Sequence, residues 1–133
     1  MKKVIIILII LAVIIGGVIM LNKNTEKETT NQIQYVSMDE ITTIIQENTN
    51  YIILDARTIE EYNEGHIPNA ICIPNETIDE TVTEQLPNKD QLILIYCRSG
   101  NRSKQAALKL HHLGYTNLIE FGGIIDWSGE ITR

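Results

Sequence analysis

Hydrophobic and polar residues divide the chain into three stretches of different character. Residues 4–21 form an unbroken apolar run of 18 residues, and residues 22–32 (NKNTEKETTNQ) are polar without an apolar side chain. From residue 33 on, short apolar runs alternate with amphipathic stretches, as in a domain that alternates strands and helices. The sequence therefore predicts an N-terminal apolar segment over 1–21, a polar tether over 22–32 and one folded domain over 33–133.

The apolar segment is long enough to cross a membrane. As a helix, 18 residues extend roughly 27 Å, close to the bilayer hydrocarbon thickness of about 30 Å. Lys2 and Lys3 precede it, as in a signal sequence, but no A-x-A cleavage pattern follows. We predict a single-pass transmembrane helix in the cell membrane, with the N-terminus in the cytoplasm and the domain outside it. The alternative is secretion after signal cleavage.

The pattern within residues 33–133 predicts an α/β fold. Capping-box sequences S-x-x-E and T-x-x-E start helices after Ser37 and Thr58, and Gly114 ends a helix that begins near Asn101. A further helix is expected from Asn75 to residue 86, and Gly122 and Gly123 are expected to form a turn. Strands are predicted over residues 33–36, 51–54, 70–73, 91–96 and 118–121. Their continuous apolar character indicates a parallel sheet with helices on both faces.

Composition and charge exclude several classes of protein. Residues 33–133 carry seven Lys and Arg against fifteen Asp and Glu, a net charge of −8 within a chain of 133 residues with net charge −6. An acidic domain is a poor nucleic-acid binder, because phosphate contacts need a basic surface. Two cysteines are too few for a disulfide-stapled miniprotein or a four-cysteine zinc site. We therefore expect neither a nucleic-acid partner nor a metal.

The segment C-R-S-G-N-R-S follows the strongest predicted strand and carries the candidate chemistry. In parallel sheets, ligands bind beyond the carboxyl ends of strands. The loop amides, the helix N-terminus and the guanidinium groups of Arg98 and Arg102 all favour the thiolate of Cys97. We predict that Cys97 is a nucleophile and that the loop binds an anionic substrate. The expected binding residues are Arg98, Ser99, Gly100, Asn101, Arg102 and Ser103.

This segment resembles the active-site loop of the rhodanese (sulfurtransferase) family. Residues 55–57 (DAR) resemble the family's D-x-R motif, residues 61–70 (EYNEGHIPNA) its E-Y-x-x-G-H-I-P-x-A motif, and residues 122–127 its G-G-x-x-x-W motif. The matches span most of the domain. The resemblance implies a five-stranded parallel sheet with helices on both faces, and transfer of sulfane sulfur through a persulfide on Cys97.

The resemblance also implies roles for the other site residues. Backbone amides of residues 98–103 would cradle a small anionic donor such as thiosulfate, while Arg98 and Arg102 pair with its sulfonate oxygens. The acceptor would be a thiol or cyanide, and no metal or organic cofactor is needed. We expect Asp55, Arg57 and His66 to support the site through structural polar contacts. Cys72 is outside the pattern and is either a buried bystander or, if near Cys97, a resolving cysteine.

Two other functions remain open. A sulfur-relay or partner-binding module would use the same cysteine with a protein donor and acceptor. A cysteine phosphatase or arsenate reductase is less favoured, because the signature C-x5-R requires arginine at position 103, where this chain has Ser103.

Overall fold

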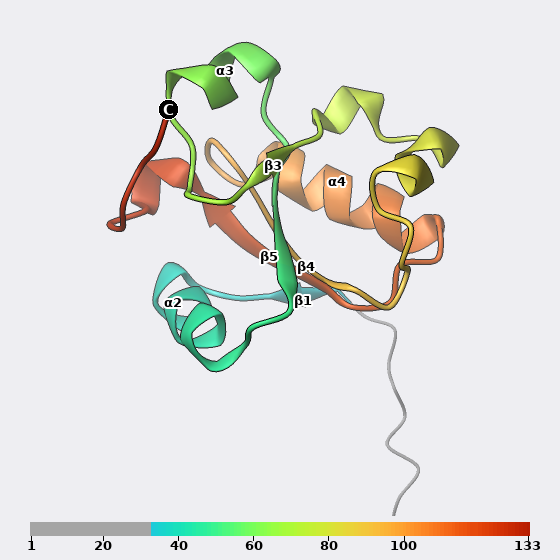
Figure 1. Cartoon of the computed structure of the whole chain (residues 1–133), viewed down its shortest axis with the longest axis horizontal. Coiled ribbons are helices and arrows are strands. Elements are labelled where there is room, and N and C mark those ends of the chain that lie inside the picture. Colours follow the sequence, from blue (N-terminus) through green and yellow to red (C-terminus); the bar gives the residue numbers. More distant parts are fainter. Residues whose placement is uncertain (1–32) are drawn as a thin grey trace, which may run out of the picture. The chain divides into compact units, whose positions relative to one another are not determined.

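Five strands form one parallel sheet in the order β1-β5-β4-β2-β3. The structure, a computed structural model, describes residues 33–133, so the predictions for 1–21 and 22–32 lie outside the described residues. Within that range, no helix is long and apolar enough to span a membrane. The predicted α/β fold with a five-stranded parallel sheet is confirmed (Figure 1). The strands are β1 (Gln34–Tyr35), β2 (Tyr51–Asp55), β3 (Ile71–Cys72), β4 (Leu92–Cys97) and β5 (Leu118–Gly123).

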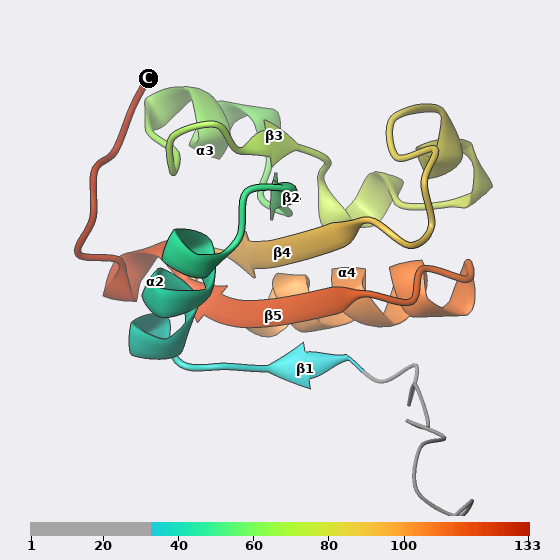
Figure 2. The ribbon, with the colours of Figure 1, turned by 60° about the horizontal axis from the view of Figure 1, so that its bottom comes forward.

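Helices cover both faces of the sheet, as predicted. Helix α2 (Met38–Glu47) packs on one face and α4 (Asn101–His112) on the other (Figure 2). Side chains alternate along β4, so that Ile95 and Cys97 face α4 while Tyr96 faces the α2 side. Cys97, at the end of β4, therefore lies beside the start of α4.

Local sequence signals fix the starts of two helices. Ser37 and Glu40 form a complete capping box at the start of α2, and Thr58 and Glu61 form another at the start of α3 (Ile59–Glu64). Each box satisfies two backbone N–H groups that the helix itself leaves without partners. Both predicted helix starts are confirmed.

The predicted helix from Asn75 is wrong. The structure has two 3-10 helices instead, η1 (Asn75–Thr77) and η2 (Glu80–Glu84). Between them, Asp79 is extended and its carboxylate accepts hydrogen bonds from the amide and hydroxyl of Thr81. Because this side chain competes with the helical hydrogen bonds of the backbone, it ends one turn and starts another.

Gly122 and Gly123 do not form the predicted turn. β5 runs through both residues and ends with the short 3-10 helix η3 (Ile124–Asp126). Along the pairing with β4, Ile95 lies opposite Glu120 and Cys97 lies opposite Gly123, so β5 contains one extra residue. This β-bulge, with Gly122 at φ +91°, bends the end of β5 beside Cys97.

Candidate active site

Cys97 is the last residue of β4, and its sulfur lies under the loop that leads into α4. The residue is 1% exposed. The backbone N–H of Gly100 donates to the sulfur at 3.0 Å. Gly100 has φ +108°, a conformation that side chains disfavour, so glycine allows the loop to turn an amide back onto the cysteine.

Hydrogen bonds at the sulfur favour the thiolate. Burial raises the pKa of Cys97, but hydrogen bonds from the hydroxyl and amide of Ser103, and from the amides of Gly100 and Ser99, outweigh it. The pKa of the thiol therefore lies below its usual value. Since the thiolate is the reactive form of cysteine, this environment suits a nucleophile.

Arg102 is held by an acidic residue of α3. Its Nη1 and Nη2 donate to the Glu61 carboxylate at 2.7 and 2.9 Å, so α4 and α3 are joined beside the loop. The hydrogen bond from Arg102 lowers the pKa of Glu61 to about 2, although burial opposes the shift. Glu61 therefore caps α3, as the T-x-x-E sequence predicts, and also pairs with Arg102. No local sequence signal points to Arg102 as its partner.

The remaining charged residue of the loop is accessible. Arg98, Ser99 and Asn101 are exposed. Among residues 33–133, the Arg98 guanidinium makes no ion pair, since those found join Arg57 to Asp55 and Arg102 to Glu61. Arg98 is therefore the arginine of this loop whose guanidinium is unengaged within the described residues.

The end of β5 packs tightly against the loop. A Cβ atom added to Gly123 would lie 2.2 Å from the carbonyl oxygen of Arg98 and 2.5 Å from the Cα of Ser99. The next residue but one, Ile125, donates its N–H to the same Arg98 carbonyl at 3.3 Å. Only glycine leaves room for the backbone of the loop at this distance, which explains why residue 123 of the Gly-Gly pair is glycine.

Asp55 and Arg57 form a closed buried network on the opposite side of the sheet. Both are buried, and the guanidinium makes Nε and Nη2 hydrogen bonds of 2.8–3.1 Å to the carboxylate. Tyr96 donates its hydroxyl to Asp55 at 2.6 Å and accepts the N–H of Ile67, while Arg57 also donates to the Gly65 carbonyl. These bonds join the loop after β2 to the segment that precedes β3.

His66 belongs to that same segment. Its Nδ1 lies 2.9 Å from the Tyr62 carbonyl, its ring stacks on Tyr62 with centroids 3.6 Å apart, and its backbone bridges to Thr132. The structure therefore places Asp55, Arg57 and His66 in structural contacts, apart from the hydrogen bonds around the Cys97 sulfur.

Cys72 lies too far from Cys97 for a disulfide. In register, Cys72 pairs with Asp55 of β2, which pairs with Tyr96 of β4. Neighbouring strands are about 4.8 Å apart, so two strand spacings give about 10 Å, beyond the about 7 Å that a disulfide tolerates between Cα atoms. Burial, reinforced by Asp55, raises the pKa of Cys72 to about 11. The resolving-cysteine interpretation is wrong.

Sequence reasoning also missed a buried acid next to the site. Glu120 of β5 is 3% exposed and accepts hydrogen bonds from the hydroxyl of Ser103 and the N–H of Gly122. The available signal was a single acidic residue within an otherwise apolar predicted strand.

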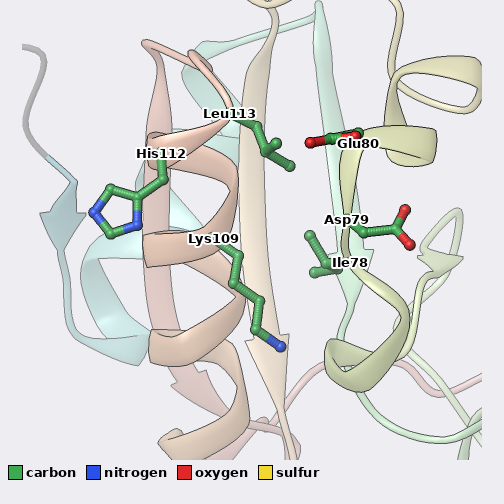
Figure 3. Close-up of a pocket in the computed structure, with 6 residues that line it drawn as sticks. All are labelled: Ile78, Asp79, Glu80, Lys109, His112 and Leu113. Atoms are coloured by element: carbon green, nitrogen blue, oxygen red, sulfur yellow. The ribbon is translucent and has the colours of Figure 1, made fainter.

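A separate hollow of about 280 Å³ lies along the C-terminal half of α4. Figure 3 shows that His112 points away from it, and the Lys109 ammonium donates to the Asn75 carbonyl at 2.6 Å. Its lining residues are Ile78, Asp79, Glu80, Lys109, His112 and Leu113. Its lining contains no cysteine. Nor do residues 33–133 contain a cluster of His, Cys, Asp or Glu that could hold a metal ion.

Comparison with protein families identifies the family of the domain. The family model described as "Rhodanese-like domain" matches residues 37–130, which include the whole sheet after β1 and the Cys97 loop. The chain belongs to the rhodanese-like family. The match to this rhodanese-like domain includes the loop from Cys97 to Ser103, and relatives of the chain include proteins named as sulfurtransferases.

Known proteins are similar over most of the domain. The chain is 34% identical over 73 residues to "Thiosulfate sulfurtransferase PspE" of Escherichia coli (strain K12), covering 55% of this chain and 70% of that protein. It is 32% identical over 104 residues to "Putative sulfur carrier protein YrkF" of Bacillus subtilis (strain 168), covering 77% of this chain and 55% of that longer protein. A structure described as "rhodanese with anions from E. coli" superposes with a TM-score of 0.58 at 30% identity, covering 62% of this chain and 98% of that one.

Proposed function

We propose that this rhodanese-like domain moves sulfane sulfur from thiosulfate, or a similar anionic donor, to a thiophilic acceptor through a persulfide on Cys97. The observation that carries the proposal is the Cys97 sulfur itself. It is buried at the end of β4, receives the Gly100 amide and has a pKa below its usual value.

The proposed reaction has two displacements. The Cys97 thiolate attacks the outer sulfur of the donor, a new S–S bond forms, and sulfite leaves with the electron pair of the broken S–S bond. The acceptor, a thiol or cyanide, then attacks the outer sulfur of the persulfide, and the Cys97 thiolate leaves. Loop amides aimed at the sulfur would stabilise its charge at each step.

Donor binding would use the accessible guanidinium of Arg98 first. Arg102 already pairs with Glu61, so it would contribute charge near the sulfur more than a new bidentate contact. A relative described as containing anions supports an anion site in this fold. Arg98→Ala should raise KM for thiosulfate more than Arg102→Ala, and both should affect neutral polysulfides less.

The test is sulfur loading followed by turnover. Incubation of the full chain with thiosulfate should add one sulfur atom to the intact mass, and cyanide should remove it as thiocyanate. If neither thiosulfate nor other sulfane donors load Cys97, the proposal is contradicted.

A sulfur-relay module is the second candidate, because a similar protein is named a putative sulfur carrier. It would load as readily but turn over slowly with small acceptors, whereas an enzyme of the thiosulfate type would turn over quickly with cyanide. The phosphatase or arsenate-reductase alternative is weaker, since the buried Ser103 stands where that loop needs arginine.

We further propose that residues 1–21 anchor the domain to the cell membrane, with the N-terminus in the cytoplasm and the domain outside. The support is the 18-residue apolar run after Lys2 and Lys3. Alkaline carbonate should leave the full chain in the membrane fraction, and external protease should digest the domain in intact cells or spheroplasts. Release of a shortened chain into the medium would indicate a cleaved signal instead.

A further inference from the structure

Glu120 is a buried acid beside the Cys97 loop, and the proposed sulfur transfer leaves it without a role. It lies on β5 opposite Ile95 of β4. Its Oε1 accepts the Ser103 hydroxyl at 2.5 Å and the Gly122 N–H at 2.9 Å. One carboxyl oxygen therefore ties the first turn of α4 to the bulge of β5, the two elements that enclose Cys97.

The Ser103 hydroxyl is the link between Glu120 and the sulfur. Ser103 is fully buried, and its hydroxyl also lies 2.9 Å from the Gly100 carbonyl. Ser103 lies in the first turn of α4, three residues after Gly100, whose N–H donates to the Cys97 sulfur at 3.0 Å. The interaction of the Ser103 hydroxyl with Cys97 favours the thiolate and so lowers the pKa of Cys97, against the effect of burial. A hydroxyl has a single proton to donate. When that proton is donated to Glu120, it is not donated to the sulfur, so the two acceptors compete.

We propose that Glu120 is a positioning residue that acts on Cys97 through Ser103, anchoring the loop while it holds the hydroxyl proton away from the sulfur. The effect of Glu120 on catalysis rests on the proposed sulfur transfer, whereas its effect on the ionisation of Cys97 does not. The carboxyl sets how strongly Ser103 can stabilise the thiolate.

The other charged groups near the loop are either exposed or paired with side chains other than Ser103. Arg102 of α4 is engaged by Glu61 of α3, with Glu76 of η1 also acting on it. On the far face of the sheet, the Asp55 carboxylate is engaged by Arg57 and Tyr96. The exposed titratable neighbours are Arg98 of the loop, Tyr35 of β1 (in register with Glu120) and Asp126 of η3.

The test compares acid with amide at position 120. Glu120→Gln keeps an oxygen that accepts from Gly122 and Ser103 but loses the charge that holds the hydroxyl proton. The full chain carrying Cys72→Ser is alkylated with iodoacetamide across a pH series, so that Cys97 is the reacting thiol. We expect Glu120→Gln to lower the midpoint of the rate profile by about one pH unit. An unchanged or raised midpoint would overturn the proposal.

A second pair of variants tests the route through Ser103. In a Ser103→Ala background, Glu120→Gln should give less than about half of that shift, because the shared hydroxyl is gone. An equal shift would mean that Glu120 acts by charge alone and would overturn the route. Asp126→Asn removes a similar charge from an exposed position of η3 and serves as the matched control, with an unchanged midpoint expected.

The anchoring role has its own measurement. Glu120→Leu offers no acceptor and should slow sulfur loading from thiosulfate about tenfold, whereas Glu120→Gln should stay within about threefold of wild type. Equal loading by Glu120→Leu and wild type would overturn anchoring. Alkylation needs no sulfur donor, so a midpoint shift without any loading would contradict the proposed function and leave the role of Glu120 intact.

Discussion

The loops after β2 and β4 both start at the carboxyl ends of parallel strands, but the negative charge in each is stabilised by different groups. After β2, the Asp55 carboxylate is surrounded by donors from Arg57 and Tyr96, so its charge is neutralised by side chains. After β4, the Cys97 sulfur receives the backbone N–H of Gly100, while Arg98 stays exposed. A network that satisfies itself stabilises the fold, whereas a loop lined by amides leaves room for a substrate's charge.

Removal of the nucleophile should have the largest effect on the β4 loop. Cys97→Ser should abolish sulfur loading from thiosulfate, because a serine hydroxyl does not form the persulfide. Cys72→Ser is the matched control and should load as wild type does, since Cys72 lies two strands away. Intact mass spectrometry measures both, and loading of the Cys97→Ser chain would show that another residue carries the sulfur.

Removing the acid of the β2 loop should affect stability and not reactivity. Asp55→Ala leaves the buried Arg57 charge unpaired, which we expect to lower the free energy of unfolding by about 3–5 kcal/mol. Urea denaturation of the full chain measures this loss. Below the transition, the pH profile of Cys97 alkylation should match wild type; a shifted profile would show that the two loops are coupled.

Gly123→Ala tests the contact between β5 and the β4 loop. The added methyl group would collide with the backbone of Arg98 and Ser99, so the loop must move. We expect a loss of about 2–4 kcal/mol in stability and a loading rate reduced about tenfold. Gly122→Asn is the comparison, because its Cβ meets open space: it adds the strain of a side chain at φ +91° but no collision with the loop. Normal loading by Gly123→Ala would rule out tight packing here.

The smallest expected effect concerns the ion pair between the loop helix and α3. The pKa of Glu61 is lowered from 4.5 to about 2, so the pair stabilises the fold above about pH 4.5 and this contribution is lost as pH falls toward 2. Glu61→Gln should cost about 1 kcal/mol at pH 7, and its difference from wild type should shrink at pH 3. Urea midpoints at the two pH values measure this, and a difference that grows at low pH would contradict it.

Elements specified by neighbouring residues were predictable from the sequence. The capping boxes at Ser37 and Thr58 placed two helix starts, and the continuous apolar strands indicated a parallel sheet. The helix expected from Asn75 to residue 86 is absent, although Ile78, Val82 and Leu86 lie at helical spacing and are buried. The Asp79 carboxylate breaks the helix between them.

Within the site, the position of Cys97 at a strand end followed from the sequence, but its partners did not. The Glu61–Arg102 pair and the Glu120–Ser103 bond join residues 41 and 17 positions apart. Such contacts depend on strand order and on the extra residue in β5, and neither leaves a local signal.

Because Cys97 is buried, the addition of a sulfur atom to it would change which acceptor molecules can reach the transferable sulfur. Cys97 is only 1% exposed, so the sulfur without its cargo is almost covered by the protein. A persulfide would place the transferable atom about 2.05 Å further out, nearer the rim of the loop. Acceptors too large to reach the free Cys97 sulfur would then be able to reach the outer sulfur of the persulfide. Such acceptors would react only after the donor has transferred its sulfur, and would not compete with the donor for free Cys97.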